Sequence, residues 1–397
     1  IHTSRLLDLA AVCSSEPMDQ SETDATPGVE TERTDVHELV DDYLTARRDE
    51  HGSGTYAASA KTELDRWVNW MAERGYGLES LEERGPDILR QYATRLRQRT
   101  QSGGIAASTA QTYFAYISAC LSFAVREGRL DRNPAQTETA RELLPEDSRD
   151  RGDQQHWSPE QRARLMNHVE ERAETAIDED PFGAYTEARD RALVAMLYYA
   201  AVRGAEVLRH RQDERDGRQG LRWERVNLDA GTMRILGKDQ SWETAPIPSP
   251  ALRPLRVLKK VQRPASDDWP VFATSHAPSL WKAAREQLDG EVDALVEDLG
   301  SINAVLREHD VATPALTTDG ARSVLKRLTE AAEIDVDEGY LQPHGARRGM
   351  IGEVYKRDRG EAQDLGRHKS METTREAYSH LDAEEQRQRL DELVEEF

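Results

Sequence analysis

Three polar motifs follow one another in the second half of this 397-residue chain, with one strand pattern between the first and the second. The motifs are AVRGAE at 201–206, QPHGARRGM at 342–350 and DLGRHKSMETTREAYSHL at 364–381. The strand pattern consists of TMRIL and TAPI, which are short and rich in β-branched or apolar residues, joined by GKDQSWE as a connecting turn. This order predicts a mainly α (α+β) fold, in which a mostly helical domain carries one small antiparallel β-sheet.

Each motif, taken alone, has an ordinary structural interpretation. Arg203 and Glu206 have the spacing of an ion pair on a helix, and His344 is compatible with a residue that caps a helix. Tyr378 is compatible with an exposed helical aromatic residue, and Lys238 with a solvated loop lysine. The order and spacing of these groups favour one shared site instead.

The ordered motifs resemble those of the tyrosine recombinases, also called the phage integrase family. AVRGAEVL is similar to the first family box, Gly-Leu-Arg-x-x-Glu-Leu, and the segment from LRWERVNL to TAPIP is similar to the strands that carry the family lysine. QPHGARR resembles the His-x-Leu-Arg-His box, and LGRHKSMETTREAYSHL resembles the Leu-Gly-His, Thr-Thr, Tyr, His ending. The resemblance covers residues 190–381 and implies a helical core-binding domain followed by an integrase-type catalytic domain.

The chain departs from the family pattern at four places. Alanine and valine at 201–202 stand where Gly-Leu is usual, and Arg348 replaces the second histidine of its box. One extra residue lies between His368 and Tyr378, and the segment HRQDERDGRQG at 210–220 interrupts the usual run. None of these departures removes a chemical group that the reaction needs.

The chemistry of phosphodiester cleavage explains the choice of residues. The five-coordinate transition state spreads negative charge over the non-bridging oxygens, and planar guanidinium groups bind such oxygens in pairs, so Arg203 and Arg347 are predicted to clamp the phosphate. Tyr378 is predicted to attack phosphorus and to hold the strand as a covalent ester, which splits one difficult exchange into two reversible steps. Because the phosphotyrosine stores the bond energy, no ATP, metal or other cofactor is expected.

Two protons must also move. A tyrosine hydroxyl titrates at about 10, so a neighbour must accept its proton, and the departing 5′ oxygen must receive one. The resemblance implies that His344 accepts the first proton, that Lys238 donates the second and that His368 donates a hydrogen bond to the phosphate. Glu206 lies one helical turn from Arg203 and is expected to orient it. The expected catalytic set is Arg203, Lys238, His344, Arg347, His368 and Tyr378.

The net charge is unusual for a DNA-binding protein. It is −21, from 74 acidic residues against 53 lysines and arginines, whereas phosphate contacts supply most of the non-specific affinity for DNA. Only 8 of the 53 cations are lysines, and this acid-rich, lysine-poor composition favours a halophilic archaeal type of host with molar intracellular salt. At about 1 M salt the Debye length is about 3 Å, so distant carboxylates hardly repel DNA. An ordinary acidic mesophilic protein is the alternative.

Positive charge is concentrated in one N-terminal segment. Residues 88–135 hold seven arginines and two acids, which is typical of a DNA-contacting face. Polar residues at the start of the helical pattern around Tyr113 are expected to meet phosphates, while the apolar positions of that helix form a core. The candidate DNA-binding residues are Arg90, Arg95, Arg97, Arg99, Ser108, Thr109, Thr112 and Arg126.

Composition and periodicity divide the chain into four parts. Residues 1–35 are acidic and without periodicity, so they are predicted to be a disordered tail. Residues 36–135 show four helical segments and are interpreted as the core-binding (DNA-binding) domain. Residues 136–157 are predicted to be a charged linker, and 158–397 the catalytic domain, with an acidic helical insertion at 286–310.

The chain carries little evidence for secretion or membrane insertion. LLDLAAVC near the start is too short for a signal peptide or a membrane span, and Met18 is expected to lie nearer a natural start. Cys13 and Cys120 give neither a disulfide framework nor zinc-ligand spacing. A cytoplasmic protein without a membrane partner is expected.

Three functions are compatible with these observations. The favoured one is a site-specific DNA recombinase or integrase that cuts and rejoins strands through a 3′-phosphotyrosine, acting on paired double-stranded DNA as a tetramer of one chain. A type IB topoisomerase would share the chemistry but relax supercoils as a monomer. A catalytically silent DNA-binding accessory protein is the third, and the retention of all six reactive groups argues against it.

Overall fold

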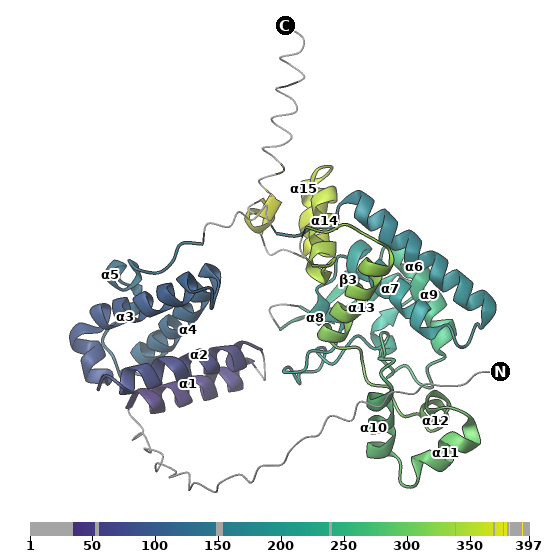
Figure 1. Cartoon of the computed structure of the whole chain (residues 1–397), viewed down its shortest axis with the longest axis horizontal. Coiled ribbons are helices and arrows are strands. Elements are labelled where there is room, and N and C mark those ends of the chain that lie inside the picture. Colours follow the sequence, from purple (N-terminus) through teal and green to yellow (C-terminus); the bar gives the residue numbers. More distant parts are fainter. Residues whose placement is uncertain are drawn as a thin grey trace, which may run out of the picture.

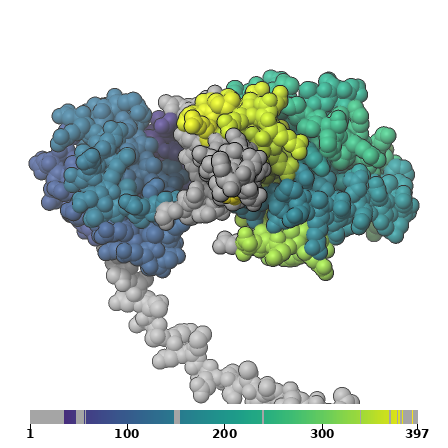
Figure 2. Space-filling model, turned by 90° about the horizontal axis from the view of Figure 1, so that it is seen from above, coloured from purple at the N-terminus to yellow at the C-terminus, as the bar shows by residue number. Residues whose placement is uncertain are grey.

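The computed structural model describes residues 35–51, 55–147, 154–237, 240–337, 339–367, 370–375, 377, 378, 381 and 391. The described chain is mainly helical and contains one three-stranded antiparallel sheet, which confirms the predicted fold class (Figure 1). Figures 1 and 2 show the helices up to α5 on one side of the molecule and the elements from α6 onward on the other, as two blocks. Within the described ranges, no helix is both long and apolar enough to cross a membrane. The predicted disordered tail lies almost wholly outside them.

The first block is a helical bundle, and its four long helices correspond to the four predicted segments. Its buried side chains include large aromatic residues, among them Tyr43, Trp67, Tyr92 and Phe114. Apolar residues at helical spacing therefore face one another across the bundle. The elements of this block are α1 (Asp35–His51), α2 (Thr55–Ala72), α3 (Leu78–Gln101), α4 (Ala107–Arg126), the 3₁₀ turn η1 (Pro134–Gln136) and α5 (Glu138–Arg141).

The segment predicted as a linker, 136–157, is partly integrated into both blocks. Helix α5 lies within it, and Ala140 is buried in the bundle core. At the other end, Trp157 is buried in the second core, and its backbone N–H donates to the carbonyl of Gly345 at 3.1 Å. The indole N–H of Trp157 donates to the carbonyl of Gln342 at 3.0 Å. The segment was predicted to be a linker because its many charged residues outnumber the few apolar residues that fix its two ends.

The second block is built around α7, which is almost fully enclosed. Every residue from 188 to 198 is buried, and the helix contacts α6, α9 and α14. Helix α6 begins with a capping box, in which Ser158 Oγ accepts from Gln161 N–H at 3.2 Å and Pro159 occupies the first position. The main helices of this block are α6 (Pro159–Glu179), α7 (Tyr185–Tyr199), α9 (Ser249–Gln262), α13 (Thr318–Ala331) and α14 (Pro343–Tyr355).

The predicted hairpin forms two strands of the sheet. Strands β2 (Thr232–Leu236) and β3 (Trp242–Pro246) pair antiparallel, with Leu236 opposite Trp242. Met233, Ile235 and Ala245 are buried in the second core, as the alternation of a half-buried sheet requires. A short strand β1 (Val226–Asn227), preceded by the 3₁₀ turn η3 (Trp223–Arg225), pairs with β2 on its other side.

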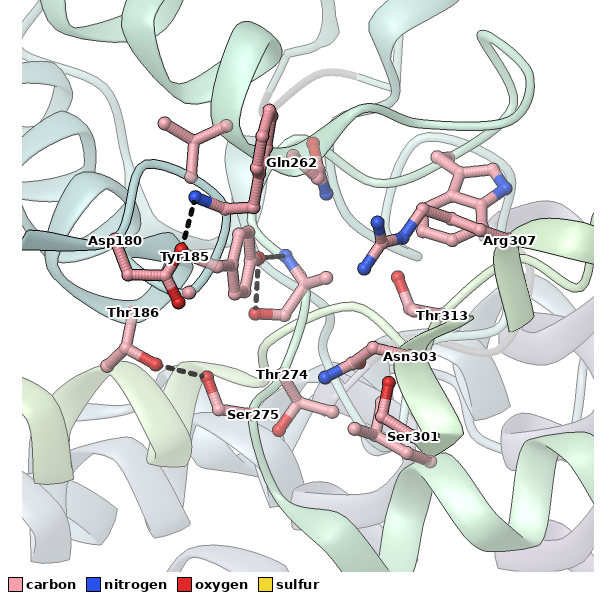
Figure 3. Close-up of a pocket in the computed structure, with 16 residues that line it drawn as sticks. Asp180, Tyr185, Thr186, Gln262, Thr274, Ser275, Ser301, Asn303, Arg307 and Thr313 are labelled. Carbon is pink, nitrogen blue, oxygen red and sulfur yellow. Dashed lines mark hydrogen bonds between the residues drawn. The ribbon is translucent and has the colours of Figure 1, made fainter. Parts of the chain in front are cut away.

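The predicted acidic insertion forms helices α11 (Val292–Leu299) and α12 (Ile302–Glu308), which follow α10 (Ala277–Gln287). A cavity of about 380 Å³ lies between this insertion and the N-terminal end of α7. Figure 3 shows the guanidinium of Arg307 directed into it, and Tyr185 bonded to the backbone of Ala273 on its opposite side. The lining includes none of the predicted catalytic residues, because the 201–206 motif follows the other end of α7.

Candidate active site

Arg347, in the motif at 342–350, forms hydrogen bonds to the motifs at 201–206 and 364–381. It lies on the first half of α14 and is buried, with 4% of its surface exposed. Its guanidinium donates through Nη1 to the carbonyl oxygen of Ala201 and through Nη2 to that of Gly366, the last residue of α15 (Arg359–Gly366). Ala201 has a φ of 45°, in the left-handed region that favours glycine, which explains why glycine is usual at this place in the family box.

Glu206 forms the second junction of the site. It lies on the short helix α8 (Gly204–Val207) and is 2% exposed. Its carboxylate accepts hydrogen bonds from the backbone N–H of Arg203 at 2.7 Å, from Nη1 of Arg203 at 2.8 Å and from Nη2 of Arg367 at 2.5 Å. Burial raises the pKa of Glu206, but the Arg367 and Arg203 cations outweigh burial and bring that pKa below its usual value. The carboxylate is therefore ionised and orients Arg203, as predicted.

These contacts close a ring of three guanidinium groups. Arg203 and Arg367 share the Glu206 carboxylate. Arg347 donates to one backbone carbonyl two residues before Arg203 and to another carbonyl one residue before Arg367. Burial, together with the nearby Arg203 and Arg367 cations, lowers the pKa of Arg347 to about 9. These three cations outnumber the carboxylates paired with them, Glu206 and Glu243, so the ring has an excess of positive charge and favours an anion.

Tyr378 lies next to this ring and is buried, with 7% of its surface exposed. Its ring packs against Tyr355 at a centroid distance of 5.5 Å and lies beside Gly352 of α14. Burial raises the pKa of Tyr378 to about 12, although the Arg347 and Arg348 cations oppose the rise. This placement rules out the interpretation of Tyr378 as an exposed helical aromatic residue.

His344 begins α14 near the same charges. Gln342 is the N-cap of this helix and makes no side-chain capping bond, so His344 is not the cap. The imidazole keeps contact with solvent, but partial burial and the cations of Arg348 and Arg347 lower the pKa of His344 to about 4. At neutral pH the imidazole is uncharged and able to accept a proton.

Residues 158–385 match the Phage integrase family, which is more than half of the chain. The chain belongs to this family. Phage integrases of this kind are tyrosine-type site-specific recombinases that act on DNA.

Individual relatives are distant. The tyrosine recombinase XerC of Pelobacter propionicus is 23% identical over 255 residues, which cover 64% of this chain and 71% of the relative. XerC of Xylella fastidiosa (strain 9a5c) is 26% identical over 223 residues, which cover 55% of this chain and 63% of the relative, less than two thirds of its length. Among solved structures, the Tn1549 transposon integrase in complex with transposon right end DNA has a TM-score of 0.52 at 12% identity. That match covers 89% of this chain and 99% of the other, and it supports the fold.

Two catalytic residues predicted for this phage integrase, Lys238 and His368, lie outside the described residues. The strands on either side of the lysine segment are described, and their connection begins at Gly237. Arg218 fixes this point: its Nη2 donates to the carbonyl of Gly237 at 2.7 Å, and its Nη1 donates to the carbonyl of Ala205 at 3.0 Å. The segment that interrupts the family pattern therefore ties the base of the lysine loop to the turn that carries Arg203.

Sequence reasoning missed both Arg218 and Arg367. Arg218 lies in a charged segment without periodicity, and no local signal marks it. Arg367 directly follows Leu365 and Gly366, the place at which the Leu-Gly-His motif has its histidine, and this position was a usable signal.

The predicted DNA-binding residues lie on α3 and α4 of the bundle, and two of them pair with carboxylates. Arg99 binds the fully buried Glu63 at 3.3 Å, so it neutralises a carboxylate in the bundle. Arg90 forms an ion pair with Glu142 at 3.1 Å. Arg95 and Arg126 are exposed, and Arg97 is half-buried. Ser108, Thr109 and Thr112 occupy the first turns of α4, where the Thr112 hydroxyl donates to the carbonyl of Ser108 at 2.9 Å.

Proposed function

We propose that this protein cuts and rejoins double-stranded DNA at specific sites through a 3′-phosphotyrosine formed on Tyr378. One observation carries the proposal: Arg203 and Arg367 share the Glu206 carboxylate, Arg347 bonds to the backbone next to both of them, and a buried tyrosine lies beside these three guanidinium groups. A phosphodiester supplies the missing negative charge, and its charge increases toward the transition state, where fixed guanidinium donors are most effective.

The cleavage step forms one bond and breaks another. The Tyr378 oxygen attacks phosphorus, the bond from phosphorus to the 5′ oxygen breaks, and the products are a 3′-phosphotyrosine and a free 5′ hydroxyl. Because the pKa of Tyr378 is raised to about 12, the hydroxyl is protonated at neutral pH and needs a base. The neutral imidazole of His344 is proposed as that base.

The remaining proton and donor are assigned by resemblance. Lys238 is proposed to protonate the leaving 5′ oxygen, and His368 to donate a hydrogen bond to the phosphate. Rejoining reverses the step: the 5′ hydroxyl of a partner strand attacks the phosphotyrosine and releases Tyr378. The exchange needs no external energy source because every step replaces one phosphoester with another.

The assembly is proposed to contain paired duplexes and a tetramer of this chain. A solved integrase with the same fold is bound to DNA, which supports a duplex as the partner. We assign residues 36–135 to the core-binding domain and 158–397 to the catalytic domain. Arg95, Arg97 and Arg126, together with the hydroxyl groups at the start of α4, are proposed to meet the DNA backbone.

A halophilic archaeal host and a cytoplasmic location are also proposed. The net charge of −21 and the preference for arginine over lysine support adaptation to molar salt. A DNA substrate is consistent with a reducing compartment, and so is the presence of two cysteines in the whole protein chain.

Sequencing of trapped DNA tests this function against its two alternatives. The protein is incubated with total DNA of its source, denatured, and the DNA that stays covalently attached is sequenced. A recombinase yields one short recurring sequence, and the Tyr378→Phe variant yields none. Dispersed sequences would indicate topoisomerase activity, and the absence of attached DNA from the native protein would indicate a silent DNA-binding protein.

A further inference from the structure

Arg367 is held inside the site by contacts from three different segments. It caps α15 with a φ of 45°, so the chain turns there and the side chain is 11% exposed. Nη2 donates to Glu206 at 2.5 Å, and Nε lies 3.7 Å from a carboxylate oxygen of Glu243 on β3. The preceding carbonyl, that of Gly366, accepts from Arg347. The position of Arg367 is therefore fixed from α8, β3 and α14.

The guanidinium also has an unused donor. Nε of Arg367 is buried and has no hydrogen-bond partner among the described residues, since 3.7 Å to Glu243 is too long for a hydrogen bond. A buried N–H without a partner is costly unless a bound group satisfies it. Glu206 does not bond to this Nε, because its oxygens accept from the backbone N–H and Nη1 of Arg203 and from Nη2 of Arg367.

The charge of the ring gives the chemical class of the missing group. Three guanidinium groups against the carboxylates of Glu206 and Glu243 leave one positive charge, and a phosphodiester carries one negative charge that increases as the tyrosine attacks. We propose that Arg367 binds a non-bridging oxygen of the scissile phosphodiester and is a third phosphate-binding arginine of this site, in the role that the family resemblance gives to the histidine after Leu-Gly. This inference rests on the proposed function.

A second role is compatible with the same contacts: Arg367 only neutralises Glu206 and so positions Arg203. The two roles differ in their dependence on Arg203. A residue that acts only through Arg203 has no further effect on the rate once Arg203 is replaced, so Arg367→Ala is also measured in the Arg203→Ala background. A direct donor to a non-bridging oxygen still contributes in that background, and it loses importance when that oxygen is replaced by a methyl group.

The experiment measures single-turnover cleavage of nicked duplexes that carry either a phosphodiester or a methylphosphonate at the cleavage point. Arg367→Ala is expected to lower the rate on the phosphodiester about a hundred- to a thousandfold, and on the methylphosphonate about tenfold or less. Arg367→Lys keeps the charge but loses the planar donors, and an intermediate loss is expected. Arg357→Ala, which changes an exposed arginine two residues after the end of α14, is the matched control and keeps the native rate on both substrates.

Three results would overturn the inference: equal losses by Arg367→Ala on both substrates, a rate within threefold of the native one, or a larger phosphodiester loss in His368→Ala than in Arg367→Ala. Site binding and thermal unfolding are measured for each variant, and Arg367→Lys decides the outcome if the alanine variant does not fold. The native protein distinguishes failure of this inference from failure of the proposed function. If the native protein forms no covalent adduct with DNA, the proposed function itself is contradicted.

Discussion

Arg218 donates a hydrogen bond of 2.7 Å from Nη2 to the carbonyl oxygen of Gly237, which lies 19 residues further along the chain. The same guanidinium reaches Ala205 in the turn after Arg203. One buried side chain thus connects the proposed phosphate clamp to the base of the loop that carries Lys238. The segment that interrupts the family pattern supplies this connection.

Arg218→Ala is expected to impair proton donation by the lysine loop, because it removes the hydrogen bonds to the carbonyl groups of Ala205 and Gly237 and frees the base of that loop. A loss of about 1 to 3 kcal/mol of stability is expected, with a cleavage rate lowered at least about tenfold. Arg211→Ala, an exposed arginine of the same segment, is the control. A substrate with a 5′-bridging phosphorothiolate, whose sulfur leaves without a proton, should restore most of the rate, and failure of this rescue would refute the connection to Lys238.

The phosphorothiolate substrate also distinguishes the role of Arg203 in the phosphate clamp from that of Lys238 as the proposed general acid. Arg203→Ala should leave site binding nearly intact and lower the cleavage rate by about 3 to 4 kcal/mol, or about a hundred- to a thousandfold. The phosphorothiolate substrate should rescue Lys238→Ala but not Arg203→Ala. Equal rescue of both variants, or of neither, would show that the general acid is misassigned and would make His344 the next candidate.

The protonation of His344 gives a prediction about pH. Its pKa in the folded protein is lowered to about 4, so the folded state binds fewer protons than the unfolded state between that value and the ordinary histidine pKa of about 6.5. The contribution of His344 to stability is therefore present above about 6.5 and is lost as pH falls toward 4. NMR titration of the free protein, with His344→Gln to assign the signal, should give a midpoint well below 6; a midpoint at 6.5 would contradict the described environment.

Salt tolerance is the prediction that follows from composition. With a net charge of −21, repulsion between the protein and DNA is strong in dilute buffer and is screened at molar salt. Site binding and cleavage should therefore persist at about 2 M KCl, although ordinary DNA-binding proteins lose affinity steeply over this range. Fluorescence anisotropy across a KCl series measures this, and an optimum at about 0.1 M with loss at about 2 M would exclude the halophilic interpretation.

Local patterns were sufficient to predict the parts of the site that depend on short spacing. The Arg203–Glu206 pair needs one helical turn, and the strands around Lys238 need a run of alternating residues with a turn between them. The position of Tyr378 followed from the order of the motifs, but its burial against Tyr355 did not, because that contact depends on how α14 packs.

Long-range contacts explain what the sequence did not reveal. Arg367 meets Glu206 across 161 residues, and Arg99 meets Glu63 across 36, so no local pattern indicates either pair. In both cases a buried carboxylate pairs with an arginine. Other basic residues lie near that arginine in the sequence, so nothing in the sequence distinguishes it from them. One of these arginines enters the proposed phosphate site, and the other neutralises a carboxylate of the bundle core.

Tyr378 is the proposed nucleophile, and the identity of the residue bonded to DNA is the most direct test of it. A duplex nicked beside the cleavage point loses the short 5′ fragment after cleavage and traps the covalent intermediate, which is digested and mapped by tandem mass spectrometry. A single 3′-phosphotyrosine at Tyr378 is expected, present in the Tyr340→Phe control and absent from Tyr378→Phe. An adduct that persists in Tyr378→Phe, or that maps to any other residue, would contradict the proposed mechanism.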